Sequence, residues 1–217
     1  MIKGIIFDFD GLIIDTETPQ YRVFNDIFLD YDSELPLSIW QLEVGTASTF
    51  NSFDLLESQI NRKVNQAELR KRTRMKIKSA LEYAPIREGV IEFLNEAKKL
   101  NLKIGLASSS NYTWVSNHLK RVGLYHYFEC IKTSDDVDKV KPDPDLYIKT
   151  AKCLGLRPEQ CLAFEDSANG AKAAKDAKMK CIVVPNEITS SMDFGEVEYR
   201  INSMSEKSLS YLLNYLS

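Results

Sequence analysis

Short apolar runs recur along this chain, and longer segments with helical periodicity separate them. The runs span residues 2–9, 103–107, 128–132, 161–164 and 180–184, and a weaker sixth spans residues 199–202. A strand of a parallel sheet gives such a run because helices bury both of its faces. The alternation therefore predicts an α/β fold built on a doubly wound parallel sheet.

One interval between the runs is too long for a single crossover. About 95 residues separate the first two runs, whereas roughly 20 to 30 separate the later ones. The extra residues have helical patterns throughout, and the first apolar stripe comprises Val23, Phe24, Ile27, Phe28 and Tyr31. We therefore expect a core of residues 1–15 and 85–217, with an α-helical cap domain of residues 16–84 inserted after the first strand.

A capping pattern marks one helix of this insertion. Asn65 with Glu68 three residues later is typical of a helix N-terminus. The residues expected on one face of this helix are Leu69, Thr73, Ile77, Ala80 and Leu81. Its basic residues are Arg70, Lys71, Arg72, Arg74, Lys76 and Lys78. We interpret these as a solvent-facing surface, and attraction of anionic substrates is the alternative.

The composition fits a globular protein that binds neither nucleic acid nor membranes. The 217 residues include 28 Lys and Arg against 31 Asp and Glu, a formal net charge of −3. No apolar stretch reaches the ~18 residues of a membrane helix, and the first run is too short and acidic for a signal peptide. We expect a cytoplasmic protein and assume a monomer, although the sequence does not reveal the oligomeric state.

The cysteines and histidines give no sign of a metal site. There is no CxxC pair, and the four cysteines lie in apolar or helical contexts, at Cys130, Cys153, Cys161 and Cys181. We expect four buried reduced thiols. His118 and His126 are the only histidines, which argues against a histidine-rich metal site.

Acidic, hydroxyl and basic residues stand where the predicted strands end. Asp8 and Asp10 end the first run, Ser108 to Ser110 follow the second, Lys141 follows the third, and Glu165 and Asp166 end the fourth. The carboxyl ends of parallel strands meet at one edge of a sheet, where ligands bind. The four loops are therefore expected to line one crevice.

The carboxylates of this crevice suit a hard cation. Asp8 and Asp10 are two residues apart, and Gly11 lets the chain turn sharply after them. Together with Glu165 and Asp166 they form an oxygen cage that fits Mg²⁺ and a substrate phosphate. The plainer alternative for the aspartate pair is solvation in a turn.

The serines and the lysine suit a phosphoryl group. Ser108 and the N–H groups after it precede a helix expected near Asn111, which makes an anion site. A serine N-cap explains the same pattern. Lys141 could neutralise a phosphoryl group, or be an ordinary exposed lysine.

Taken together, these residues resemble the four ordered motifs of the haloacid dehalogenase superfamily of phosphotransferases. The motif residues are Phe7-Asp8-Phe9-Asp10-Gly11, Ser108, Lys141-Pro142 and Glu165-Asp166. The helical insertion resembles the C1-type cap of that superfamily, whose core is Rossmann-like. Further stretches resemble its β-phosphoglucomutase-like and sugar-phosphatase branch, namely Asp15-Thr16-Glu17, Lys141-Pro142-Asp143-Pro144 and Glu165-Asp166-Ser167-Ala168-Asn169-Gly170.

The resemblance implies a phosphatase that works through an aspartyl-phosphate. Asp8 would be the nucleophile, and Asp10 the general acid and then the general base. Mg²⁺ would be held by Asp8, the backbone carbonyl of Asp10 and Asp166, with Glu165 either ligating the metal or orienting a water. The phosphoryl oxygens would be received by Ser108, Ser109 and Lys141.

The cap is expected to select a small phosphorylated metabolite, such as a sugar phosphate. The candidates for specificity are Thr16, Glu17, Gln20, Val44, Gly45 and Thr46. Position 20 is glutamine where β-phosphoglucomutases carry histidine, and the segment Gly45-Thr46-Ala47-Ser48 lacks the arginine that holds their second phosphate. These departures favour hydrolysis over a phosphohexomutase. Trp114 and the cap aromatics are interpreted as packing residues.

A third hypothesis is a phospho-accepting regulatory module rather than an enzyme. Such a module also uses an aspartate, Mg²⁺ and a lysine on a doubly wound sheet. It would be smaller, and it would need neither a helical cap nor Asp10. The phosphatase therefore remains the leading hypothesis.

Overall fold

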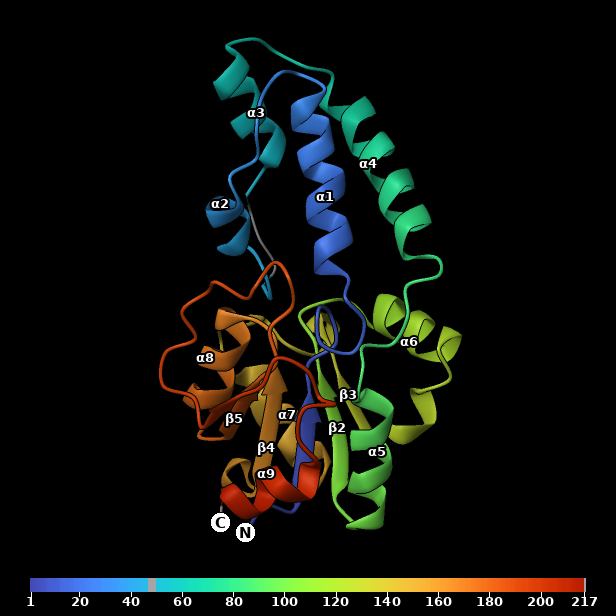
Figure 1. Cartoon of the computed structure of the whole chain (residues 1–217), viewed down its shortest axis with the longest axis vertical. Helices are drawn as coiled ribbons and strands as arrows, with labels where there is room; N and C mark the ends of the chain where they lie inside the picture. The colour runs from blue at the N-terminus through green and yellow to red at the C-terminus, as the bar shows by residue number, and fades with distance from the viewer. Residues whose placement is uncertain (47–49, 217) are drawn as a thin grey trace.

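The computed structural model describes residues 1–46 and 50–216, and Figure 1 shows their arrangement. One sheet of six parallel strands has the order β3-β2-β1-β4-β5-β6. The strands are β1 (Gly4–Phe7), β2 (Lys103–Ala107), β3 (Cys130–Lys132), β4 (Cys161–Glu165), β5 (Lys180–Val183) and β6 (Tyr199–Arg200). All six predicted runs, the weak sixth included, are confirmed as strands.

Helices cover both faces of the sheet because successive strand residues point to opposite sides. Ile5 and Phe7 pack in one apolar cluster with α5 (Val90–Lys99), α6 (Tyr112–Arg121) and α9 (Leu209–Tyr215). Ile6 packs in the other with α7 (Asp145–Cys153) and α8 (Ala168–Asp176). This arrangement confirms the doubly wound α/β fold.

Between β1 and the crossover helix α5, the described residues form four further helices, as the long interval predicts. They are α1 (Glu17–Leu29), α2 (Leu37–Gln41), α3 (Ser52–Ile60) and α4 (Gln66–Leu81). They stand beyond the carboxyl ends of the strands, and both chain termini lie at the far end of the molecule (Figure 1). Residues of α1, α3 and α4 share an apolar cluster that includes Ile27, Phe28 and Leu69. The division into residues 1–15 and 85–217 and residues 16–84 stays a prediction.

The predicted N-cap at Asn65 is confirmed, and α4 begins at the next residue. The Asn65 side chain accepts from the backbone N–H of Glu68 at 3.2 Å. Leu69, Thr73 and Leu81 of α4 are buried. Ala80, expected on the same face, is exposed, so that part of the prediction is wrong.

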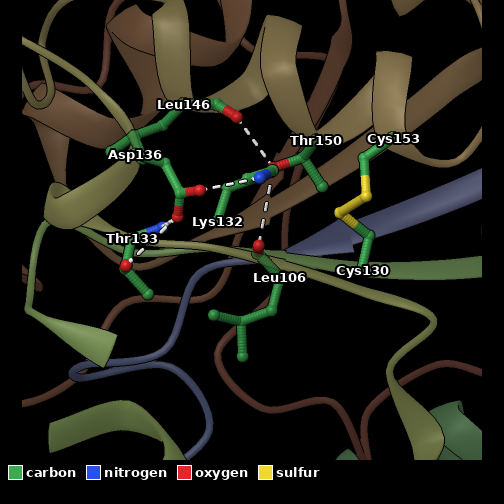
Figure 2. The surroundings of a disulfide bond; sticks show 8 residues. All are labelled: Leu106, Cys130, Lys132, Thr133, Asp136, Leu146, Thr150 and Cys153. Atoms are coloured by element: carbon green, nitrogen blue, oxygen red, sulfur yellow. Dashed lines mark hydrogen bonds and ion pairs between the residues drawn. A yellow bond between two sulfur atoms is a disulfide. The ribbon is translucent and has the colours of Figure 1, made fainter. Parts of the chain in front are cut away.

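Two of the four cysteines form a disulfide, and the expectation of four reduced thiols is therefore wrong. Cys130 of β3 is bonded to Cys153 at the end of α7, with a Cα–Cα distance of 6.1 Å (Figure 2). Cys161 and Cys181 are free and buried. The two cysteines are 23 residues apart in the sequence, and the packing of α7 on β3 brings them together. Because disulfides are typical of oxidising compartments, the cytoplasmic localisation stays a prediction.

The surroundings of the disulfide are tied by hydrogen bonds. Thr150 of α7 donates its hydroxyl to the carbonyl of Leu146 at 2.7 Å, and Lys132 lies 2.7 Å from Asp136 (Figure 2).

Within residues 1–46 and 50–216, no helix combines the length and apolar character needed to cross a bilayer.

Candidate active site

Three carboxylates meet where β1 and β4 end. Asp8 follows β1 directly, Glu165 is the last residue of β4, and Asp166 is next in the chain. The two strands pair in parallel with Phe7 opposite Phe164, so their ends lie side by side. One oxygen from each carboxylate lies within 4.8 Å of the others, and all three residues are buried. The structure thus brings together three of the predicted metal ligands.

Lys141 is fully buried among these carboxylates. Its Nζ donates to Asp8 and to Glu165, the latter at 2.6 Å. Burial alone lowers the pKa of Lys141, but the two carboxylates outweigh it and raise that pKa, so the amine stays charged. The Tyr147 hydroxyl donates to the same Glu165 oxygen at 2.6 Å. The lysine therefore lies inside the site and is not an exposed surface residue.

The cluster holds more negative than positive charge when its acids are ionised. Burial raises the pKa of Asp8 to about 8 against the opposing pull of Lys141. Burial, together with Asp8 and Glu165, raises the pKa of Asp166 well above its usual range. Three buried carboxylates beside one lysine are a donor set that fits a small divalent cation.

Two residues that the sequence did not suggest fix the loop around Asp166. Asn186 donates its side-chain amide to Asp166 at 2.7 Å. Arg87 donates to the carbonyls of Gly11 at 2.5 Å and Pro185 at 2.7 Å, which ties the loop after β1 to the loop after β5. Neither residue belongs to a recognisable motif, so no signal in the sequence could have found them.

Asp10, also a predicted metal ligand, is not among these three clustered carboxylates, and its side chain accepts hydrogen bonds from several side chains. Its donors are Ser110 at 2.6 Å, Trp114 Nε1 at 2.8 Å, Thr16 at 2.9 Å and Ser108 at 3.4 Å. Trp114 packs against the apolar core, as interpreted, and its indole N–H also donates to a predicted catalytic carboxylate, which the sequence did not suggest. The helix after the serines is capped by Asn111, which accepts from the Trp114 N–H, and not by a serine.

A cavity of about 550 Å³ connects the carboxylates to the cap. Its walls include Asp8, Asp10, Ser108 and Ser109, and also the specificity candidates Glu17, Gln20, Val44, Gly45 and Thr46. Burial, with the nearby aspartates, raises the pKa of Glu17 to about 8. Thr16 is fully buried and contacts Asp10 instead of lining the cavity. Ala47 and Ser48 lie outside the described residues.

The loop after α2 closes one side of this cavity against the core. Ser109 donates its hydroxyl to the carbonyl of Gly45 at 2.8 Å, and Asn169 donates to the carbonyl of Val44 at 2.8 Å. On the same side Gln41 donates to the carbonyl of Ile188 at 2.6 Å. The candidate specificity residues are therefore held directly over the strand ends.

The comparisons with known proteins agree with this fold. The family model of haloacid dehalogenase-like hydrolases matches residues 5–184. "Putative phosphatase YhcW" of Bacillus subtilis (strain 168) is 52% identical over 100% of this chain and 99% of its own length. A "Phosphorylated carbohydrates phosphatase" of Thermotoga maritima is 28% identical over 83% of this chain and 84% of its own.

A solved structure shares the architecture at low sequence identity. The crystal structure of β-phosphoglucomutase (pgmB) from Clostridium difficile has a TM-score of 0.76 and 23% identity, covering 99% of this chain and 97% of its own. At that identity the likeness concerns the fold alone.

The chain belongs to the haloacid dehalogenase-like hydrolase family. Within that family it is a phosphatase, an enzyme that hydrolyses phosphoric monoesters. This confirms the predicted family and enzyme class, and the comparisons do not favour the phosphohexomutase.

Proposed function

We propose that this enzyme is a Mg²⁺-dependent phosphatase that hydrolyses a small phosphorylated sugar or a related metabolite through an aspartyl-phosphate on Asp8. The observation that carries the proposal is the position of Asp8. Its carboxylate lies on the wall of the cavity, beside a buried lysine and two further buried carboxylates. The relative from Thermotoga maritima, whose name gives phosphorylated carbohydrates as its substrates, supports the sugar-phosphate class.

The roles of the residues follow from their places around Asp8. Asp8, Asp166 and the backbone carbonyl of Asp10 would hold Mg²⁺, with Glu165 as a ligand or as the partner of a bound water. When bound, Mg²⁺ would neutralise these anions and polarise the phosphoryl group as a Lewis acid. Lys141 would keep Asp8 oriented and stabilise the charge that develops on the phosphoryl oxygens.

The proton transfers and the anion contacts would come from the loops after β1 and β2. Asp10 would protonate the leaving oxygen as Asp8 attacks phosphorus, and would then deprotonate the water that cleaves the aspartyl-phosphate. Ser108 and the Ser109 N–H would receive the remaining phosphoryl oxygens. The cap loop at Gly45 and Thr46 would contact the rest of the substrate.

Phosphate release from a panel of sugar phosphates, nucleotides and an aryl phosphate tests this function. We expect release that needs Mg²⁺, disappears with a chelator, and is lost in Asp8→Asn and in Asp10→Asn. Asp26→Asn is the matched control, because Asp26 is exposed on α1 and lines neither of the two cavities beside the cap. Mg²⁺ should also raise the melting temperature of the wild type, since a ligand that binds only the folded state stabilises it.

Other outcomes would contradict the proposal. Equal turnover by Asp8→Asn and wild type would show that Asp8 is not the nucleophile. Full turnover in chelator would show that the reaction does not need Mg²⁺. Conversion of a hexose 1-phosphate to its 6-phosphate without free phosphate would point to the mutase instead. A long-lived phospho-adduct without turnover would indicate a regulatory module.

A further inference from the structure

A second cavity, of about 720 Å³, lies between the cap and α6 of the core. Its walls come from α1, α3, α4 and α6, and Figure 1 shows α4 standing above α6 on this side of the molecule. We call it the basic groove, because four cationic side chains line it: Arg70, Arg74, Lys78 and Arg121. Its remaining wall is largely apolar and includes Phe53, Ile77 and Leu81.

No ion pair in the described part of the chain compensates the positive charge of the basic groove. Arg70 donates to the side-chain oxygen of Asn51 at 2.8 Å, and Arg121 donates to the Ala84 carbonyl at 3.0 Å. Neither they nor Arg74 and Lys78 form an ion pair within the described residues.

One cation of α4 outside the groove is paired with a carboxylate. Arg72, between the groove residues in sequence, forms an ion pair with Asp30 of the cap. Glu82 is the one carboxylate among the described residues that line the groove. The groove therefore keeps a surplus of positive charge next to an apolar surface, which suits an anionic ligand with an apolar or partly apolar body.

The basic groove adjoins the cavity of about 550 Å³ that Asp8 and Asp10 line, which we call the catalytic cavity. Gln20, Phe24 and Trp114 belong to the walls of both cavities. Trp114 also donates to Asp10 at 2.8 Å, so a molecule resting on this tryptophan would lie next to the catalytic carboxylates.

The two cavities differ in the sign of their charge. The described wall of the catalytic cavity contains four acids, Asp8, Asp10, Glu17 and Glu43, and neither lysine nor arginine. A second anionic group on the substrate would be repelled by these acids if it stayed in that cavity. The basic groove, which shares Gln20, Phe24 and Trp114 with that cavity, offers such a group four cations.

We propose that the basic groove binds a second anionic group of the substrate, so that the preferred substrate is a phosphomonoester with another phosphate or carboxylate at its far end. The inference rests on the proposed function, because it takes the reacting phosphate to lie at Asp8. Arg74 and Lys78 bind the distal anion, Arg70 and Arg121 add to the positive field, and Trp114 and Phe24 contact the body of the substrate between its two ends.

Alkanediol bisphosphates of increasing length, each compared with its own monophosphate, test this proposal. For wild type we expect kcat/KM to be about tenfold higher for the best bisphosphate, mainly through KM, as expected for charge-assisted contacts at an exposed site. In Arg74→Gln/Lys78→Gln the advantage should fall to about one, while hydrolysis of the monophosphate stays unchanged. Added salt should shrink the wild-type advantage, since these cations are exposed to solvent.

The double variant Lys71→Gln/Lys76→Gln is the matched control. Lys71 and Lys76 lie on the same helix, outside the groove wall, and their removal changes the net charge by the same amount. The control should keep the bisphosphate advantage. An advantage that survives in the groove variant, or that the control loses equally, would overturn the proposal.

Binding to Asp8→Asn separates this proposal from the proposed function. Titration of this variant with the bisphosphate and with the monophosphate measures recognition without turnover. Preference for the bisphosphate that disappears when Arg74→Gln/Lys78→Gln is added supports the groove, even if phosphate release fails in every assay and the proposed chemistry falls. Equal affinities for the two ligands would refute the groove, even where the phosphatase assay succeeds.

Discussion

The catalytic cavity and the basic groove share a wall, but Asp8 of the first is buried and paired, whereas the cations of the second are exposed and have no ion pair in the described residues. Asp8 on the wall of the catalytic cavity is buried, and a buried lysine outside that wall donates to both Asp8 and the buried Glu165. In the groove, Arg74 and Lys78 are exposed on a helix and have no ion-pair partner within the described residues. One site is built from the ends of strands, and the other from the surfaces of helices in two parts of the chain.

This difference in burial predicts how each site responds to substitution. A buried charge depends on its partners, because removing one partner leaves the others without compensation in a medium of low polarity. An exposed cation is solvated whether or not a ligand is present, so its loss costs little stability. Substitutions in the catalytic cavity should therefore affect folding and catalysis, and those in the groove should affect ligand choice alone.

The largest expected effect is that of Lys141→Met. Without the lysine, Asp8 and Glu165 face each other uncompensated, so the metal-free protein should lose about 3–5 kcal/mol of unfolding free energy. Turnover should fall by about 10²–10³-fold, because a preorganised donor at the developing charge is lost. Urea denaturation in chelator and phosphate-release assays measure the two effects.

Arg74→Gln is the comparison for that experiment. It also removes one positive charge, but from the exposed groove, and should change the unfolding free energy by less than about 0.5 kcal/mol. Equal destabilisation by the two variants would show that burial does not distinguish the two sites. Mg²⁺ should return part of the stability lost in Lys141→Met, since it supplies the missing positive charge.

Gly11→Ala should have the next largest effect. Gly11 has φ of +78°, and a Cβ there would lie 2.1 Å from the Oδ2 of Asp166. Left-handed backbone alone costs an alanine about 1–2 kcal/mol. Displacement of Asp166 should lower the unfolding free energy by about 1–3 kcal/mol more. It should also weaken the stabilisation by Mg²⁺, and thermal denaturation measures both effects.

Gly123→Ala isolates the backbone cost. Gly123 has φ of +75° just after α6, and a Cβ there would have no atom within 4 Å. This variant should lose only the unfolding free energy that the left-handed backbone costs an alanine. Its stabilisation by Mg²⁺ should equal that of the wild type. If Gly123→Ala matched Gly11→Ala in both measurements, the tight packing around Asp166 would have no functional consequence.

The sequence could predict the core and the metal cluster because both are local patterns. The short run at β1 alternates between the two buried faces of the sheet, with Ile6 on one side and Phe7 on the other. Polar residues that follow such runs must lie at one sheet edge. The cluster of Asp8, Glu165 and Asp166 therefore follows from order along the chain.

Other features depend on contacts between distant segments and leave no local pattern. The disulfide needs the packing of α7 on β3, Asn186 reaches Asp166 from the loop after β5, and the basic groove needs α4 to face α6. In the sequence, the basic residues of α4 look like a uniform solvent face. The structure divides them into Arg72, which is paired, and Arg70, Arg74 and Lys78, which line the groove.

Trp114→Phe tests the wall that the two cavities share. It removes one hydrogen bond to Asp10 while keeping an aromatic ring against the groove. A hydrogen bond to a charged group contributes about 1.5–3 kcal/mol, so we expect kcat to fall about tenfold or somewhat more, with little change in KM. The bisphosphate advantage should persist, because the ring and the groove cations remain.

Trp40→Phe is the matched control for that change. Trp40 also lines the catalytic cavity, but its indole N–H has no hydrogen-bond partner in the described part of the chain. Its replacement should leave kcat within about twofold of wild type, because no bond to a catalytic group is lost. A fall in KM or kcat of the same size in both variants would mean that Trp114 acts by packing.

The last expected effect is a gradual dependence of metal-free stability on pH. Burial raises the pKa of Asp8 and of Glu17 to about 8 and that of Asp166 well above its usual range. Between about pH 4 and pH 8 the folded protein therefore holds more protons than the unfolded chain. Unfolding free energy should fall as the pH rises through that interval, and it is largest at the acidic end for these groups.

Urea denaturation in chelator at a series of pH values measures this slope, and two additions sharpen it. Saturating Mg²⁺ should flatten the slope, because a cation that replaces the protons binds more tightly as the acids ionise. Asp8→Asn should also flatten it by removing one of the groups that titrate. Arg74→Gln/Lys78→Gln should leave it unchanged, because the groove cations are exposed; a slope that changed there as much as in Asp8→Asn would mean that the two sites share one electrostatic environment.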